Sequence, residues 1–187
     1  HRSNFEAAQP PILIDSGVAI LENEKIERHI MKNIPGGHNL FIPDQDVSRN
    51  IENVYSKFKH MLMKRDEHSA KAMTAILVKV DEMLKNKGTR FLTGDTMCCF
   101  DCELMPKLRH LQFVLGSFFC DYEIPAKLTH LWKYIKEMYQ LDAFTQSNPA
   151  DQDIINVYKN QQGVRSKNHE ELETPSYTTS VPAAIAN

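Results

Sequence analysis

The sequence is poor in glycine, in long apolar runs and in unbalanced charge, and each shortage excludes a class of protein. Only 7 of its 187 residues are glycine, which argues against an all-β fold or a site built on glycine-rich loops. No apolar run approaches the roughly 20 residues that a membrane-spanning helix needs, so we expect no transmembrane helix. The 22 Lys and Arg residues are balanced by 24 Asp and Glu residues, so we expect no nucleic-acid partner.

Cysteine is also scarce, and three of the four cysteines lie together. Cys98, Cys99 and Cys102 are close in the sequence, whereas Cys120 is separate. Such a cluster is a poor disulfide framework and favours a reducing compartment. The chain begins at His1 without a charged-then-apolar leader. We therefore expect it to be a fragment that lacks an N-terminal portion.

Residues 1–39 predict a small β-β-α unit. Residues 9–15 and 18–21 read as two short strands joined by an Asp-Ser-Gly turn, which predicts a hairpin. Asn23 is a candidate N-cap for a helix in which isoleucine recurs every fourth residue. Two strands are marginal without partners, so this unit is too small to bury a core alone.

Residues 40–163 predict an all-helical domain, because apolar residues recur at helical spacing along most of its length. Gly88 is expected to close one helix as a C-cap, and Pro125 is expected to begin another. Ser147 and Asp151 are expected to open a further helix as its polar cap and first-turn acid. Residues 164–187 are rich in Ser, Thr, Glu and Pro, which predicts a disordered tail.

The segment from Phe91 to Leu108 is predicted to be the centre of the helical domain. Gly94 gives its turn a permissive backbone, and leucines then recur at near-helical spacing. Asp101 falls just inside the helix start, where a carboxylate favours exposed amide groups. Cys99 and Cys102 form a C-x-x-C pair, which is either a low-pKa redox site or a pair of packing cysteines. We favour packing, and we expect no metal because no second C-x-x-C or paired His follows at ligand spacing.

Five motifs of the sequence are distinctive: RFLTGDTMCCFDCELMPKL, PADQDIINVYK, PPILIDSG, ENEKIERHI and HEELETP. Together they resemble the chloride intracellular channel family, and its invertebrate branch in particular. The resemblance implies a glutathione-transferase-like fold of the α+β class. Residues 1–39 would then be the C-terminal end of a thioredoxin-like domain, and residues 40–163 an all-α domain of the glutathione-transferase C-terminal type.

The resemblance also implies where glutathione would bind. Pro11 matches the family's cis-proline at the border of the glutathione site, and Glu22-Asn23 matches an acid–serine pair over the γ-glutamyl carboxylate. Pro10 stands where relatives offer an N–H to glutathione, and proline has none, so we expect weak glutathione binding. Relatives carry Ser or Thr at the position of Cys98, as the capping partner of Asp101. The family's redox cysteine would precede this chain, so we expect no catalytic residue in it.

The resemblance implies a chloride intracellular channel-like function. Such a protein has a soluble form in the cytoplasm and a membrane-associated form that passes chloride under redox or pH control, with membrane lipids and cytoskeletal or other proteins as partners. One alternative is a glutathione-dependent oxidoreductase, glutaredoxin-like or omega-class-like. The other is a non-catalytic interaction module, because helical domains of this type can act without chemistry.

Overall fold

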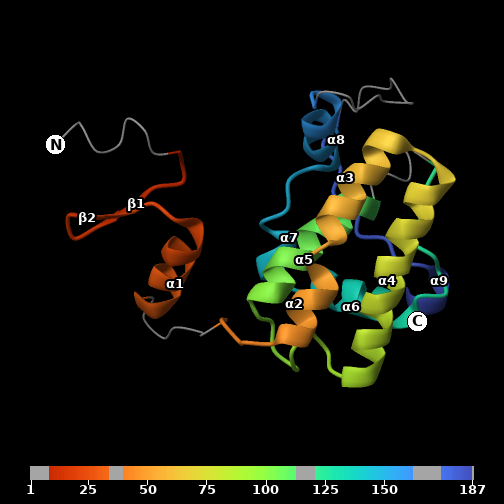
Figure 1. Cartoon of the computed structure of the whole chain (residues 1–187), viewed down its shortest axis with the longest axis horizontal. Coiled ribbons are helices and arrows are strands. Elements are labelled where there is room, and N and C mark those ends of the chain that lie inside the picture. Colours follow the sequence, from red (N-terminus) through yellow and green to blue (C-terminus); the bar gives the residue numbers. More distant parts are fainter. Residues whose placement is uncertain (1–8, 34–39, 113–120, 162–173, 187) are drawn as a thin grey trace. The chain divides into compact units, whose positions relative to one another are not determined.

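The computed structural model describes residues 9–33, 40–112, 121–161 and 174–186. The chain divides into two compact units, His1–Pro43 and Asp44–Asn187 (Figure 1). We call them the hairpin unit and the helical unit. The division lies a few residues after the expected boundary at residue 39.

The hairpin unit contains the predicted β-β-α arrangement. β1 (Leu13–Asp15) pairs antiparallel with β2 (Val18–Ile20), and α1 (Asn23–Asn33) follows. Ser16 and Gly17 connect the strands with φ angles of +49° and +80°. Two positive φ angles in a two-residue loop are typical of the hairpin turns that match strand twist, and glycine adopts the second angle without steric cost. The predicted hairpin is confirmed, whereas the expected helix stop at Pro35 lies outside the described residues. The prediction of Asn23 as the N-cap is wrong, because the Glu22 carbonyl accepts the first helical hydrogen bond and Asn23 is the first helical residue.

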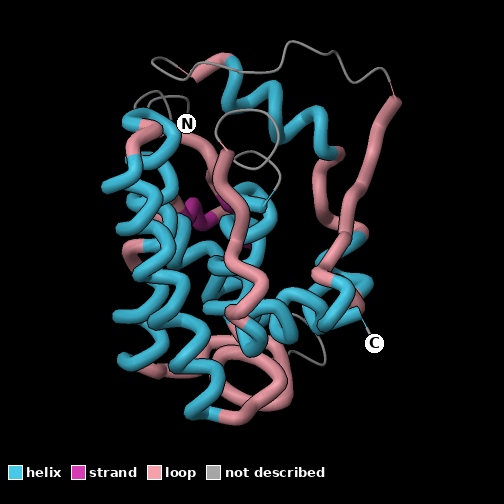
Figure 2. The backbone as a smooth tube through the Cα atoms, turned by 90° about the vertical axis from the view of Figure 1, so that its right-hand side faces the viewer, coloured by secondary structure: helices cyan, strands magenta, loops and turns pink. Residues whose placement is uncertain are grey.

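The helical unit is formed by a series of helices, and helix makes up most of its described backbone (Figure 2). Their bounds are α2 (Gln45–Ile51), α3 (Val54–Lys64), α4 (Glu67–Lys87), α5 (Cys99–His110), α6 (Thr129–Tyr139), α7 (Asp142–Thr145), α8 (Asp151–Lys159) and α9 (Ala183–Ala186).

Local capping explains where α4 begins and ends. The side chain of Asp66 accepts a hydrogen bond from the Ser69 N–H at 2.7 Å, and the Ser69 hydroxyl faces the Asp66 backbone in a reciprocal capping box. Gly88 ends the helix in the left-handed conformation, with φ at +64°. The predicted glycine C-cap is therefore confirmed.

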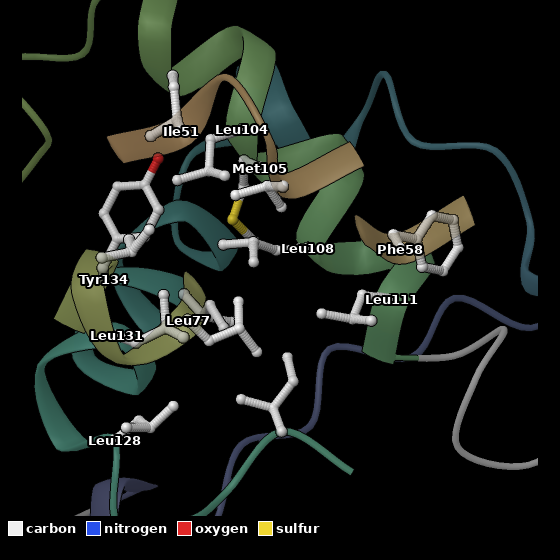
Figure 3. Close-up of a cluster of buried hydrophobic side chains, with 14 of the residues drawn as sticks. Ile51, Phe58, Leu77, Leu104, Met105, Leu108, Leu111, Leu128, Leu131 and Tyr134 are labelled. Carbon is white, nitrogen blue, oxygen red and sulfur yellow. The ribbon is translucent and has the colours of Figure 1, made fainter. Parts of the chain in front are cut away.

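Helix α5 lies at the centre of the hydrophobic core of the helical unit. Its Leu104, Met105 and Leu108 are fully buried. They lie beside residues of α2, α4 and α6, including Leu77 and Leu131 (Figure 3). Apolar contacts from several sides make this helix the element around which the others pack. The structure therefore places the segment that the sequence suggested at the centre of this unit.

Pro125 as a helix start and Ser147 as a helix cap are wrong predictions, whereas Asp151 lies in the first turn of α8 as predicted. Helix α6 begins at Thr129 rather than at Pro125, because the Pro125 carbonyl accepts hydrogen bonds from the Leu128 N–H and the Trp132 indole in a turn before the helix. Helix α8 begins at Asp151, and Ser147 instead donates its hydroxyl hydrogen to carbonyl groups of the preceding turn. A serine hydroxyl before a helix can either cap that helix or hydrogen-bond to carbonyl groups of the preceding turn, and Ser147 does the latter.

The prediction of a disordered tail is wrong for residues 174–186, which we call the C-terminal strap. Ile185 in α9 is only 7% exposed and belongs to the core cluster. Lys136 in α6 donates to the Ile185 carbonyl at 2.9 Å. One buried apolar side chain and this helix-end contact hold the strap against α6.

No helix of the described residues is long and apolar enough to cross a membrane.

Candidate functional site

The predicted border of a glutathione site lies in the hairpin unit. The peptide bond between Pro10 and Pro11 is cis, as the resemblance implied, and Ile12 alone separates it from β1. Both prolines are exposed. Pro10 therefore offers its carbonyl oxygen, but no N–H, to a ligand that lies along this edge.

Glu22 and Asn23, the other predicted border residues, lie at the start of α1. The Glu22 carbonyl accepts the hydrogen bond from Ile26 N–H, so Glu22 occupies the capping position and Asn23 is the first helical residue. The Glu22 carboxylate is already paired with Lys25. Both residues are exposed, so the start of α1 offers an accessible asparagine amide and helix N–H groups to an anionic ligand.

Asp101 is the centre of a buried polar network in the helical unit. Its carboxylate is 0% exposed and accepts hydrogen bonds from the Cys98 N–H at 2.8 Å, the Leu92 N–H at 3.2 Å and the Tyr134 hydroxyl at 2.9 Å. One side chain thereby joins the start of α5, the loop before it and α6. A buried carboxylate needs such donors, because burial without them is costly. Burial raises the pKa of Tyr134 well above its usual value, with the Asp101 charge adding to the effect.

Cys98 occupies the N-cap position of α5, as the resemblance implied. Its backbone N–H donates to Asp101, and its thiol faces the Asp101 backbone N–H in the other half of a capping box. Sulfur is a weak acceptor, so the carboxylate carries most of this cap. The preceding turn closes with a hydrogen bond from Phe91 N–H to the Gly94 carbonyl. Gly94 is not among the residues with positive φ, so this turn does not require glycine.

Cys102 of the C-x-x-C pair, like the neighbouring Cys98, has a raised pKa. Cys98, Cys99 and Cys102 are all free thiols, and Cys102 is exposed. Burial raises the pKa of the Cys98 thiol, and desolvation together with the Asp101 carboxylate raises the pKa of Cys102. A reactive cysteine needs the opposite shift. Cys102 also borders a mainly apolar cavity of about 270 Å³ with Met97 and Phe144.

Arg109 is a buried residue that the sequence analysis missed. It is 1% exposed and donates to the Asp151 carboxylate at 2.8 Å and to the Thr178 carbonyl at 2.6 Å. The same carboxylate accepts from the Thr178 hydroxyl at 2.6 Å and from Ser176 at 3.1 Å. Arg109 thus joins α5, α8 and the strap. The sequence did contain an indication of this ion pair, since Arg109 directly follows the core residue Leu108 on an apolar helix. A charged side chain in a core position needs a buried partner.

Metal binding finds no support in the part of the chain that the structure describes. No group of three or more His, Cys, Asp or Glu residues is placed there to hold a metal ion. The arrangement that is present consists of two buried carboxylates held by neutral donors and one arginine. It joins helices to one another and to the strap.

Comparisons with known sequences give strong similarity to one group of proteins. No protein-family model matches the chain. It is 63% identical over 185 residues to "Chloride intracellular channel Clic" of Drosophila melanogaster, an alignment that covers 99% of this chain and 71% of the relative. It is 33% identical over 210 residues to "Chloride intracellular channel exc-4" of Caenorhabditis elegans, with 98% of this chain and 71% of the relative covered.

Solved structures agree with the sequence comparison. The crystal structure of the CLIC homologue EXC-4 from C. elegans matches with a TM-score of 0.83 at 33% identity, over 98% of this chain and 75% of the other. Dehydroascorbate reductase from Chlamydomonas reinhardtii matches with a TM-score of 0.67 at 20% identity, over 81% of this chain and 72% of the other. The second match concerns the fold alone, and both support the predicted α+β class with a thioredoxin-like end and a helical domain.

Proposed function

Because the chain belongs to the chloride intracellular channel family, we propose that the protein passes chloride in a membrane-associated form and also has a cytoplasmic form. The observation that carries this proposal is the 63% identity over 99% of the chain to a relative named as a chloride intracellular channel. The helical unit serves as a folded scaffold in this proposal, because its polar network joins the start of α5, the preceding loop and α6.

Exposed apolar side chains on the hairpin unit support a membrane-associated form. Ile14 and Val18 are 62% and 64% exposed, and Leu21 and Ile30 are 45% and 42% exposed. Apolar surface of this kind is favourable to bury, at about 25 cal/mol per Å². We assign it to lipid in the membrane-associated form.

Chloride release from vesicles tests the proposal. The purified protein is added to chloride-loaded vesicles of mixed phospholipid, and release is followed with a chloride-selective electrode under reducing and oxidising conditions at neutral and acidic pH. We expect release above that of protein-free vesicles and of heat-unfolded protein, and slower release of gluconate under the same gradient. Equal chloride release by native and heat-unfolded protein in every condition would contradict the proposal.

For glutathione we propose weak binding at the cis Pro10–Pro11 edge, supported by the exposed Pro10 carbonyl and by the accessible start of α1 at Asn23. Pro10→Ala restores the missing N–H, and one added hydrogen bond of about 1 kcal/mol corresponds to roughly fivefold tighter binding. Titration calorimetry with glutathione measures this directly. Unchanged affinity in the variant would contradict the proposed edge contact.

A further inference from the structure

The exposed face of α3 carries several basic side chains, and the helix itself contributes no carboxylate. Lys57, Lys59 and Lys64 are all exposed, and the helix contains no Asp or Glu. Among the described residues, none of these lysines takes part in an ion pair. His60 adds a fourth basic side chain to the same exposed face.

Several exposed cations on other helices pair with a carboxylate within one turn, whereas Lys79, Lys85 and Lys133 take part in no ion pair among the described residues. Helices α1, α4 and α5 place carboxylates three or four residues before a Lys or Arg, as isolated surface helices favour. These pairs are Glu22–Lys25, Glu24–Arg28, Glu67–Lys71 and Glu103–Lys107. The face of α3 departs from this arrangement although the whole chain has a net charge of −2. Its positive charge is therefore local.

An apolar side chain lies in the middle of these cations. Met63 is 51% exposed and follows Lys59 by four residues and His60 by three, so these side chains are neighbours on the helix surface. On the opposite face, Phe58 and Met61 are buried in the core at 0% and 1% exposure. Because the core fixes that face, the lysines and Met63 are held toward solvent.

We propose that this face of α3 docks on a membrane surface rich in anionic phospholipid. Lys57, Lys59 and Lys64 lie against the headgroups, and Met63 enters the boundary between headgroups and acyl chains. This inference rests on the membrane-associated form proposed above and specifies one surface that binds the membrane.

The chemistry of the face favours lipid over a folded partner or nucleic acid. Lysine presents a compact point charge on a flexible stem, which suits a fluid array of headgroups. Arginine is preferred where a fixed carboxylate or phosphate is held by two parallel hydrogen bonds, and the face of α3 contains none. An exposed methionine gains from partial burial in lipid.

Vesicle flotation of the full chain tests the proposal. Wild-type protein is expected to bind vesicles of phosphatidylcholine with phosphatidylserine and to lose binding when salt is raised. A lysine near such a surface contributes a factor of roughly five to binding. The triple variant Lys57→Gln, Lys59→Gln, Lys64→Gln should therefore bind at least about tenfold more weakly.

A matched control removes the same charge elsewhere. Lys79→Gln, Lys85→Gln and Lys133→Gln change three exposed lysines of α4 and α6 and should leave vesicle binding within about twofold of wild type, since charges beyond about 10 Å are screened. Met63→Ser should weaken binding a fewfold without changing its dependence on salt. Far-UV circular dichroism and urea midpoints are expected to be unchanged in all variants, because every altered side chain is exposed.

The outcomes separate this inference from the chloride proposal. Equal loss of vesicle binding in the α3 triple variant and its control, or undiminished binding by the α3 variant, would overturn docking through α3. Equal binding of wild type to phosphatidylcholine alone would overturn it as well. Wild-type protein that binds through α3 and releases no chloride would instead overturn the proposed function and leave this inference standing.

Discussion

The hydroxyl of Tyr134 donates to the buried carboxylate of Asp101 across 2.9 Å, although 33 residues separate them in the chain. The remaining bonds to that carboxylate come from backbone N–H groups of Cys98 and Leu92. A single side chain therefore fixes the start of α5 and attaches it to α6. Removing the carboxylate leaves three buried donors without their acceptor, and this cost is larger than the loss of one ordinary helix cap.

Asp101→Ala is accordingly expected to lower the free energy of unfolding by about 3 kcal/mol. Tyr134→Phe, which removes only one donor, should lower it by about 1 kcal/mol. Urea denaturation followed by far-UV circular dichroism measures both. Tyr177→Phe is the matched control, because that tyrosine is 60% exposed and should be neutral. A midpoint for Asp101→Ala equal to that of the control would refute the role of the network.

Replacing Cys98, the N-cap residue of α5, with serine should stabilise the helical unit. Cys98 supplies a weak sulfur acceptor to the Asp101 backbone N–H, and serine is a stronger acceptor in the same geometry. Cys98→Ser should therefore raise the free energy of unfolding by about 0.5 kcal/mol. The control is Cys99→Ser, the neighbouring cysteine at the first helical position, which should not stabilise. A lower urea midpoint for Cys98→Ser would show that burial of the hydroxyl outweighs the improved cap.

Sequence patterns predicted the parts of this structure that depend on local rules. The hairpin turn at Gly17 and the glycine C-cap at Gly88 need only one short stretch of chain and a positive φ. Apolar spacing correctly placed Leu104 and Leu108 in the core. The family resemblance, rather than spacing, indicated the cis bond at Pro10–Pro11.

The missed features depend on contacts between distant segments. Arg109 reaches Thr178, 69 residues later, and no local pattern encodes such a pair. The composition of the tail suggested disorder, yet Thr178 and Ser176 are polar because they donate to the buried Asp151 carboxylate. Hydroxyl-rich sequence is thus compatible with order wherever a buried acceptor is available.

Alkaline pH should destabilise the helical unit through the half-buried Tyr139. Burial raises the pKa of Tyr139 from 10.0 to about 12, and its hydroxyl donates to the Gln112 side chain at 2.8 Å. The unfolded chain loses this proton near pH 10, whereas the folded chain keeps it to about pH 12. The stabilisation is therefore complete below pH 10 and is lost as the pH rises through that window, with a slope of about 1.4 kcal/mol per pH unit for this group.

Tyr139→Phe removes that contribution to the slope. Urea midpoints measured at intervals across the alkaline range should fall less steeply for Tyr139→Phe than for wild type, while Tyr177→Phe should follow wild type because that side chain is exposed. Parallel slopes for wild type and Tyr139→Phe would contradict the assignment of the shift to Tyr139.

The strap should detach when its acceptor is removed. Asp151 is 4% exposed, pairs with the buried Arg109, and accepts hydrogen bonds from Ser176 and Thr178. Asp151→Ala leaves the arginine charge buried without its carboxylate, a loss that typically costs about 3 kcal/mol or more. We expect lower stability and, before global unfolding, faster hydrogen exchange in peptides from residues 174–186.

Asp153→Ala is the control for this experiment, because Asp153 belongs to the same first turn of α8 but is exposed. Both variants remove an acid from the positive end of the helix dipole, so a general dipole effect would appear equally in both. Only Asp151→Ala should accelerate exchange in the strap, and Thr178→Val should do so more weakly, since it removes the hydroxyl donor and keeps the backbone contact. Equal exchange in the strap of the Asp151 and Asp153 variants would mean that Ile185 and Lys136, rather than the buried ion pair, hold it in place.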